Sequence, residues 1–175
     1  MLLARNEGLQ ANIFRIGNLT WRMSDGKFQT NAGDNGFVQR TRGLLKVGVY
    51  GDRLAEYPID FTPVDECAVA YVALCFGKKV NNIYHLYNPN TYSMESLSRK
   101  LLCRIKKTAQ PEFEKALRAR MDDSDVAVLA FYNSIASVSQ NIPISNEFTV
   151  NELQKLGFQW SNVGVRYLLY MKKIQ

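Results

Sequence analysis

Three cysteines and one histidine are the side chains of this 175-residue chain that most readily bind metals or form covalent intermediates. Cys67 and Cys75 lie in one predicted helix, about 12 Å apart by helical rise, which is too far for a disulfide. Cys103 has no partner at the spacing of a metal site, and His85 lies in a predicted strand, where a packed, neutral imidazole is expected. We therefore expect free, buried thiols and no metal site.

Residues 56–77, EYPIDFTPVDECAVAYVALCFG, give the clearest structural signal. Over 57–64 they are rich in β-branched, aromatic and apolar side chains, which predicts a strand, and Pro63 suits its exit because proline donates no ladder hydrogen bond. Asp65 follows at the position of a helix N-cap, and Gly77 suits a left-handed helix end. Helical spacing predicts one broad apolar face for this helix, formed by Ala68, Val69, Val72, Ala73 and Phe76.

Two further apolar runs, residues 11–19 (ANIFRIGNL) and 82–87 (NIYHLY), predict strands that are covered on both faces. A helix is predicted to begin at Ser93, and helices make up most of the remaining chain. Thr149 and Glu152 have the spacing of a capping box at one of these helices. Strands that alternate with helices predict an α/β fold with a parallel sheet.

Composition is that of an ordinary globular protein, with 46% hydrophobic and 22% charged residues, in one domain or part of one. No apolar run approaches the roughly 18 residues of a membrane span, and the N-terminus is too polar for a signal peptide. We therefore expect a cytoplasmic protein without membrane contact. The net charge is +6 and five basic residues lie within 99–107, but no nucleic-acid-binding motif accompanies them, so we expect no nucleic-acid partner.

Several segments, taken together and in order, resemble the C-terminal half of an extended short-chain dehydrogenase/reductase. More narrowly, they look like the thioester reductase domains that end nonribosomal peptide synthetases. The resemblance covers essentially the whole chain. The segments that carry it are IFRIGNLT, DGKFQTNAGDNGFVQRTRGLL, YPIDFTPVDECA, YHLYNPNTYSMESL and FTVNELQKLGFQW.

This resemblance implies that residues 1–175 form a single partial domain, the C-terminal part of a Rossmann-type extended reductase. Residues 11–19 and 82–87 would be the last sheet strands of the Rossmann part. Residues 20–77 and 91–175 would form a mostly helical substrate-binding lobe. The glycine-rich first half of the family fold would be lacking.

The resemblance also implies a cofactor contact at the carboxyl end of the first strand, where open α/β sheets bind ligands. There the backbone of Ile16, Gly17 and Asn18 would pass the nicotinamide of NADP, the cofactor expected from the family. An equally weighted alternative is a plain strand exit in which Asn18 only turns the chain. Trp21 stands where the family pattern has a glycine, and its indole could crowd the cofactor.

A loop over 24–33 and the following helix, capped by Asp34 or Asn35, would wall the substrate entrance by resemblance. The alternative is an ordinary amphipathic helix with no role for any single side chain. The entrance would admit the phosphopantetheine arm of an acyl or peptidyl carrier protein. The candidate substrate-binding residues are Phe28, Asn31, Phe37, Gln39, Arg40, Asp60 and Phe61.

No catalytic residues are identified. In the resembling family a Tyr-x-x-x-Lys pair lies on the helix that residues 1–7 would end, but none of the nine tyrosines is followed four places later by lysine. The eleven glycines never form G-x-x-G-x-x-G or G-x-G-x-x-G. The pyrophosphate turn and the proton donor of hydride transfer are both missing from this sequence, so turnover by the chain alone is not expected.

Three functions remain open. The chain could be the substrate- and carrier-binding portion of an NAD(P)H-dependent thioester reductase, which releases a carrier-bound acyl or peptidyl chain as an aldehyde or alcohol. It could be a non-catalytic carrier-binding module or an inactive gene remnant. It could also be half of a sugar-nucleotide epimerase or dehydratase. The first strand would have an open edge, which predicts docking to a missing N-terminal reductase half or self-association.

Overall fold

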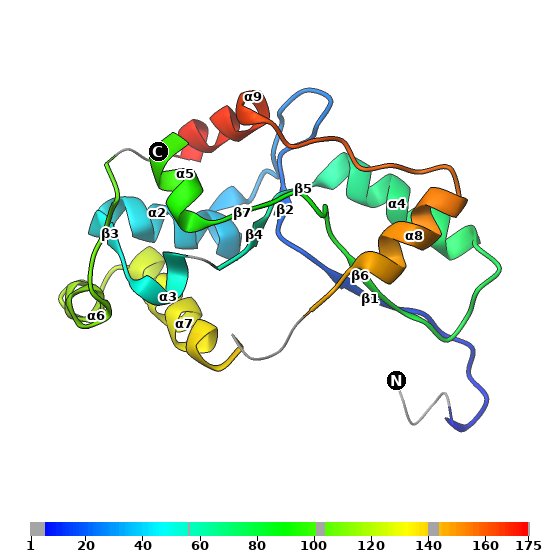
Figure 1. Ribbon diagram of the computed structural model, residues 1–175, viewed down its shortest axis with the longest axis horizontal. Helices are drawn as coiled ribbons and strands as arrows, with labels where there is room; N and C mark the ends of the chain where they lie inside the picture. The colour runs from blue at the N-terminus through cyan, green and yellow to red at the C-terminus, as the bar shows by residue number, and fades with distance from the viewer. Residues whose placement is uncertain (1–5, 56, 101–103, 140–143, 175) are drawn as a thin grey trace. The chain divides into compact units, whose positions relative to one another are not determined.

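The computed structural model describes residues 6–55, 57–100, 104–139 and 144–174 (Figure 1). The helix end predicted over 1–7 therefore lies largely outside the described residues. The fold is α/β, as the sequence predicts, with short parallel strand pairs and many helices. None of the helices in these described segments is long and apolar enough to cross a membrane.

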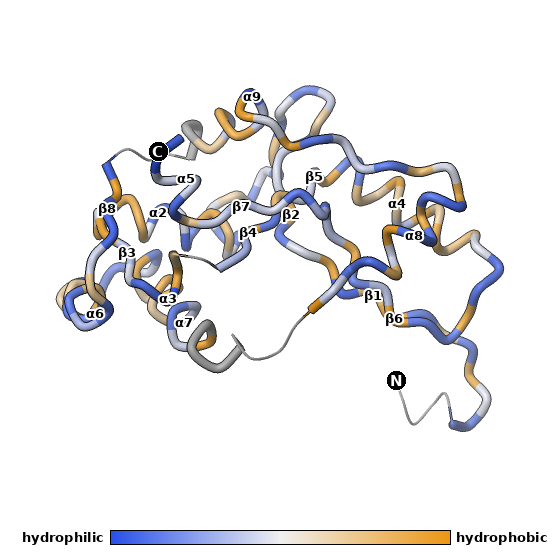
Figure 2. Tube along the Cα trace, viewed as in Figure 1, coloured by the Kyte–Doolittle hydropathy of each residue, from blue (hydrophilic) through white to orange (hydrophobic). Residues whose placement is uncertain are grey.

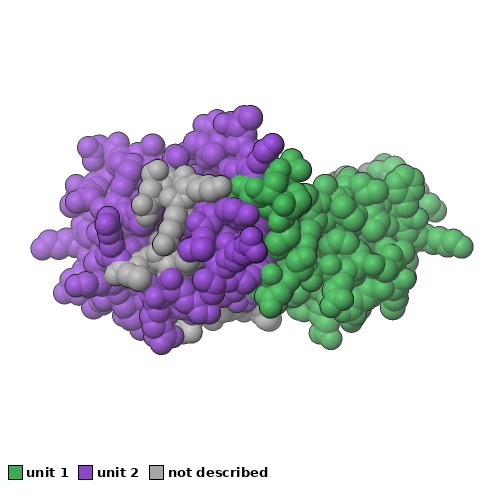
Figure 3. Space-filling view, turned by 90° about the horizontal axis from the view of Figure 1, so that it is seen from above, with its two compact units in different colours: residues 1–26, 60–90, 144–162 green, residues 27–59, 91–143, 163–175 purple. Residues whose placement is uncertain are grey.

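The chain divides into two compact units, each assembled from three separate segments (Figure 3). Unit 1 contains Met1–Gly26, Asp60–Asn90 and Ile144–Asn162. Unit 2 contains Lys27–Ile59, Thr91–Pro143 and Val163–Gln175.

Unit 1 is built around β1 (Ile13–Ile16) and β6 (Ile83–Leu86), which run parallel and pair residue for residue. These strands lie within the two apolar runs that predict them. A second parallel pair joins β2 (Leu19–Thr20) to β5 (Thr62–Pro63). The single strand predicted over 57–64 is instead divided, because Phe61 separates β4 (Ile59–Asp60) from β5.

Two helices, α4 (Val64–Phe76) and α8 (Glu147–Lys155), contact each other and β6 (Figure 1). Their inward side chains bury apolar surface against the strand, and this burial is the main favourable term in the folding of such a core. The core of unit 1 consists of Cys67, Ala70, Leu74, Tyr84, Leu86, Leu153 and Trp160.

The apolar face predicted for α4 is wrong. Val69, Val72 and Phe76 are 59%, 49% and 87% exposed, whereas the buried face is formed by Cys67, Ala70 and Leu74. The helix, VDECAVAYVALCF, has apolar residues on its buried side and on its exposed side alike, and Figure 2 colours much of it as hydrophobic. Spacing alone cannot decide which side of such a helix packs, and here the neighbours β6 and α8 decide it.

The N-cap predicted for α4 is wrong, and the helix stops before Gly77 as predicted but without the predicted left-handed conformation. The helix begins at Val64, so Asp65 lies inside its first turn, where its carboxylate accepts hydrogen bonds from Met23 N (2.8 Å) and Ser24 N (3.1 Å). Asp65 thereby ties a distant loop to the helix instead of capping its own helix. Gly77 has an extended backbone, with φ −63° and ψ 148°, and does not form a left-handed end.

The capping box predicted at α8 does not form, because the helix begins at Glu147, before Thr149. The Thr149 hydroxyl oxygen instead accepts a hydrogen bond from His85 N at 3.0 Å. Glu152 forms ion pairs with two lysines. Both side chains therefore connect α8 to the sheet and to its surroundings, and neither caps the helix.

The two described cysteines differ in burial, and the histidine is half-buried. Cys67 and Cys75 are free thiols, but only Cys67 is buried, so the prediction of burial is wrong for the exposed Cys75. Cys103 lies outside the described residues. Half-buried His85 has its pKa lowered by burial and then by the charge of Arg15, which favours the neutral imidazole that the sequence predicts.

Unit 2 is mostly helical, and its largest contact joins α2 (Gly36–Val47) to α7 (Ser124–Ser139). Asn35 caps α2 by accepting hydrogen bonds from Phe37 N and Val38 N, which confirms one of the two predicted caps. The other elements that lie wholly in unit 2 are η1 (Ala32–Asp34), β3 (Val49–Tyr50), α3 (Asp52–Ala55), β7 (Thr91–Tyr92), α5 (Met94–Lys100), β8 (Lys106–Lys107), α6 (Gln110–Arg118), α9 (Val165–Leu168) and η2 (Leu169–Ile174).

Candidate functional site

The candidate site of unit 1 lies where β1 and β6 end together. The chain leaves β1 at Ile16, and Gly17 N donates a hydrogen bond to Leu86 O, the last residue of β6, at 3.1 Å. Parallel strands present their carboxyl ends at one edge of the sheet, and open α/β sheets bind ligands at that edge. The side chain of Ile16 is 48% exposed there.

Asp60 organises this edge. Its carboxylate accepts hydrogen bonds from Asn18 N at 2.8 Å, from Asn18 Nδ2 at 2.7 Å and from the Thr62 hydroxyl at 2.8 Å. Asn18 O in turn accepts a bond from Thr62 N at 3.0 Å. The structure therefore brings together two residues that the sequence assigns to different roles, Asn18 for the cofactor and Asp60 for the substrate.

Position 17 has room only for glycine. A Cβ at this position would lie 2.3 Å from Asp60 Oδ2 and 2.5 Å from the Tyr87 Cβ, closer than real side-chain contacts. The absence of a side chain thus lets the backbone approach Asp60. This close approach, rather than a special backbone conformation, explains the glycine.

Asn88 extends the polar cluster and is completely buried. Its backbone N donates to the Thr62 hydroxyl at 3.1 Å, and its side-chain nitrogen donates to Ser161 O at 3.0 Å. Asn90 N donates to Asn88 Oδ1 at 2.9 Å. Sequence reasoning missed Asn88, although its place directly after an apolar strand run, in Asn-Pro-Asn, was a usable signal.

The negative charge of Asp60 also affects nearby titratable groups. Burial and then the Asp60 charge raise the pKa of the Cys67 thiol to about 11. The same two causes, in the same order, raise the pKa of Tyr87. At neutral pH the thiol is therefore protonated, so Cys67 is a core residue and not a nucleophile. Phe61 is 0% exposed and likewise belongs to the interior.

The other predicted substrate residues lie in unit 2, on α2 and the loop before it. Phe37 is buried, and the Arg40 guanidinium lies 5.5 Å from the Phe37 ring centroid and 4.7 Å from that of Tyr132. Gln39 and Phe28 are half-buried, and Asn31 is exposed. Cation–π contacts of this kind hold the guanidinium against the unit, so Arg40 is positioned by α2 and α7.

A small cavity adjoins these residues of unit 2. Its volume is about 10 Å³, which is about the room needed for a single water molecule. It is lined by Phe37, Arg40, Thr41, Leu44, Ile59, Met94, Leu97 and Met171. A carrier arm does not fit a space of this size, so the cavity is not itself a substrate channel.

The described residues also contain no group of three or more metal-binding side chains.

No protein-family model matches the chain, and no curated protein matches it. Solved structures do. The chain is similar to a thiolation-reductase di-domain from an archaeal nonribosomal peptide synthetase, with 25% identity and a TM-score of 0.80, over 99% of this chain and 37% of that one. It is also similar to the reductase domain of the aureusimine biosynthetic cluster, with 27% identity and a TM-score of 0.79, over 99% of this chain and 46% of that one.

A weaker likeness involves a nucleoside-diphosphate-sugar epimerase from Staphylococcus aureus, with 14% identity, a TM-score of 0.54 and coverage of 97% of this chain and 55% of that one. It shows only a shared fold. The chain spans less than half the length of the two reductase structures it matches. The chain therefore shares its fold with the reductase domains of nonribosomal peptide synthetases, and it resembles their C-terminal half, as the sequence motifs predict.

Proposed function

We propose that this chain is the substrate- and carrier-binding portion of an NAD(P)H-dependent thioester reductase and does not turn over by itself. The observation that carries the proposal is the cluster of Gly17, Asn18 and Asp60 at the carboxyl end of β1, in a chain whose structural neighbours are reductase domains. The nearest alternative in chemistry, an epimerase half, has only the weaker structural likeness.

Of the three residues proposed to meet a nicotinamide, Ile16 has an exposed side chain, whereas Gly17 and Asn18 are engaged within the unit. The backbone N and O and the side-chain nitrogen of Asn18 are bonded within the unit, and the space in front of Gly17 is filled by Asp60 and Tyr87. These residues therefore position the strand end, and Ile16 offers an exposed apolar side chain to a planar ring. NADPH, when bound, supplies the hydride. We also propose that a separate N-terminal reductase half holds the pyrophosphate of this cofactor.

A carrier protein is the proposed macromolecular partner. One of the similar structures contains a thiolation domain beside its reductase domain. Unit 2 presents Lys106 and Lys107 as exposed residues of β8, and Lys107 Nζ lies 3.3 Å from an Asp52 oxygen. An acidic carrier surface would meet this basic strand through screened, long-range attraction, which speeds encounter more than it tightens binding.

The test is a titration of the purified chain with a carrier protein that bears phosphopantetheine, at low and at high salt. We expect weak binding that is lost at high salt because the Debye length falls from roughly 10 Å at 0.1 M to about 3 Å at 1 M. Lys106→Glu should weaken binding, whereas Lys115→Glu, an exposed lysine on α6, should not. Binding whose affinity does not change with salt concentration, or no binding at all, would contradict the carrier proposal.

A non-catalytic binding module or an inactive remnant remains the second candidate. The specific observation in its favour is the sequence itself, which has no Tyr-x-x-x-Lys pair and no glycine-rich phosphate turn. Steady NADPH oxidation with a thioester substrate, above a protein-free control, would show that the chain turns over alone and would overturn the proposed inactivity. Carrier binding without turnover is compatible with both candidates. Turnover on adding an N-terminal reductase half would separate them.

A further inference from the structure

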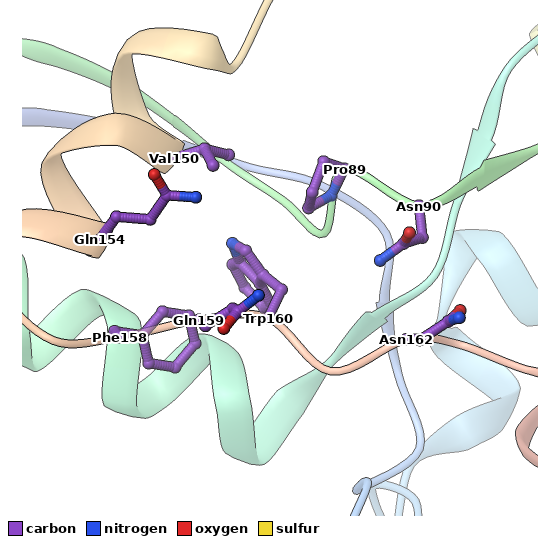
Figure 4. Close-up of a pocket in the computed structure, with 8 residues that line it drawn as sticks. All are labelled: Pro89, Asn90, Val150, Gln154, Phe158, Gln159, Trp160 and Asn162. Carbon is purple, nitrogen blue, oxygen red and sulfur yellow. The ribbon is translucent and has the colours of Figure 1, made fainter.

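A pocket of about 280 Å³ lies in unit 1 (Figure 4), and one of its lining residues, Asn90, bonds Asn88 of the polar cluster. Its walls come from α8, from the turn after β6 and from the segment that follows α8. Its size is close to the lower end of ordinary small-molecule sites. The lining residues are Pro89, Asn90, Val150, Gln154, Phe158, Gln159, Trp160 and Asn162.

The chemistry of this lining is neutral and polar. Four of its side chains are carboxamides, each of which carries both donors and acceptors, and the described residues that line it include no charged group. Nearby charges are compensated, because Glu152 is paired with Lys79 at 2.7 Å and with Lys155 at 2.7 Å. A neutral ligand with hydrogen-bonding groups fits this lining, whereas a phosphate or a carboxylate has no cation to meet.

Trp160 lines the pocket and is only 8% exposed. Its indole is held by an edge-to-face contact with Phe158, with centroids 5.2 Å apart and planes at 89°. Among the described residues, no hydrogen-bond acceptor is placed for its buried Nε1–H. In Figure 4 the nitrogen end of the indole is turned toward Val150 and Gln154, which line the pocket. A buried donor without a partner is unfavourable, so a ligand that supplies an acceptor gains from meeting it.

We propose that this pocket binds a neutral carboxamide ligand whose carbonyl oxygen accepts the Trp160 Nε1–H and whose N–H donates to a carboxamide on the rim. Gln154 is an exposed side chain that lines the pocket beside the nitrogen end of the indole, and the proposal requires it to move aside because Nε1 is buried. The apolar faces of Phe158 and Pro89 suit the flat amide plane. The ligand class is thus a peptide group or a small-molecule amide, and the proposal stands independently of the reductase function.

The experiment follows the indole N–H resonances of the ¹⁵N-labelled full chain during titration. Trp160 and Trp21 are the two tryptophans, so Trp21 is an internal control. The probes are N-acetylglycine N-methylamide, for a peptide group, and benzamide, for a small-molecule amide. Methyl benzoate, which lacks the N–H, is the matched control. We expect a saturable downfield shift of the Trp160 signal, with a dissociation constant on the order of millimolar for ligands of this size.

Tighter binding of the peptide probe identifies a peptide source, and tighter binding of benzamide identifies a small-molecule source. Equal shifts of both indoles, a Trp160 shift as large with methyl benzoate, or no shift with either amide would overturn the proposal. Exchange of the Trp160 N–H with a resident water, with no response to the amides, would overturn it too.

Variants separate binding from folding. Trp160→Phe removes the donor and with it the indole reporter, so its binding is followed through the backbone amide resonances of α8 and should weaken roughly tenfold. Because Trp160 is a core residue, Gln154→Leu at the exposed rim provides a second test with little risk to the fold, and weaker binding is expected there as well. Asn151→Leu, an exposed carboxamide on the same helix outside the pocket, should bind as the parent chain does. Folded Trp160→Phe and Gln154→Leu chains that bind unchanged would refute the assignment.

Discussion

Gly17 and Asp60 show how single residues hold the candidate site. Asp60 receives hydrogen bonds from Asn18 and Thr62, and it can do so because Gly17 leaves the backbone room to approach. Asp60 is half-buried, and each hydrogen bond that its carboxylate accepts restrains the turn after β1. This arrangement leaves the Ile16 side chain exposed at the carboxyl end of β1.

Gly17→Ala should destabilise unit 1 by about 1–3 kcal/mol, because the new methyl group would overlap Asp60 and Tyr87. Urea unfolding followed by circular dichroism measures the change. Gly33→Ala is the matched control, since no atom lies within 4 Å of the added Cβ, and its effect should stay within about 0.5 kcal/mol. Equal stability of the two variants would mean that the turn relaxes without cost.

At the scale of elements, α8 shows how one helix is fastened to unit 1. Thr149 bonds the backbone of β6, Leu153 enters the core, and Glu152 binds one lysine from its own helix and one from the segment before β6. The hydrogen bonds from Lys155 and then Lys79 hold the pKa of Glu152 below its ordinary value of 4.5. A carboxylate with a lowered pKa in the folded state links stability to pH.

The contribution of Glu152 to stability should decrease as the pH falls. The Glu152 contribution is present above pH 4.5, the ordinary value, and is lost as the pH falls through the lower pKa of the folded state. Glu152→Gln should therefore flatten the decline in urea midpoint between neutral pH and acid. Glu7→Gln, at an exposed position, should leave the decline unchanged. Identical slopes for parent and Glu152→Gln chains would show that the ion pairs do not couple to folding.

At the scale of the whole molecule, the chain presents apolar surface that it does not cover. Val69, Val72 and Phe76 lie on one side of α4 and are largely exposed, and β1 pairs only with β6 among the described strands. Each large side chain left in water forgoes about 1.5–3 kcal/mol of burial. An open strand edge also invites pairing with another chain.

We therefore expect the isolated chain to self-associate, or to dock onto a separately made N-terminal reductase half. Light scattering should show species larger than the 19.9 kDa monomer. Val72→Lys combined with Phe76→Lys should shift the distribution toward monomer, whereas Phe131→Lys, at an aromatic of α7 that is 62% exposed, should not. A monodisperse parent monomer with a sharp thermal transition would contradict this expectation.

Much of the fold follows from the sequence because the signals involved are local. The apolar runs at 11–19 and 82–87 contain β1 and β6, and their alternation with helices gives the α/β class. Asn35 caps α2 by bonding N–H groups two and three residues away, so its role depends on its immediate neighbours alone. The motif order also predicts the resemblance to reductase domains.

Tertiary structure decided the rest, because distant groups compete with local ones. Asp65 bonds backbone N–H groups 42 and 41 residues away, although its sequence position suggests a cap for its own helix. Thr149 bonds β6, 64 residues away, although its spacing suggests a capping box. The spacing of apolar residues in α4 identifies a helix, but neighbours brought by the fold choose its buried face. Asp60 joins Asn18 for the same reason, since a hydrogen bond across 42 residues exists only once the sheet has formed.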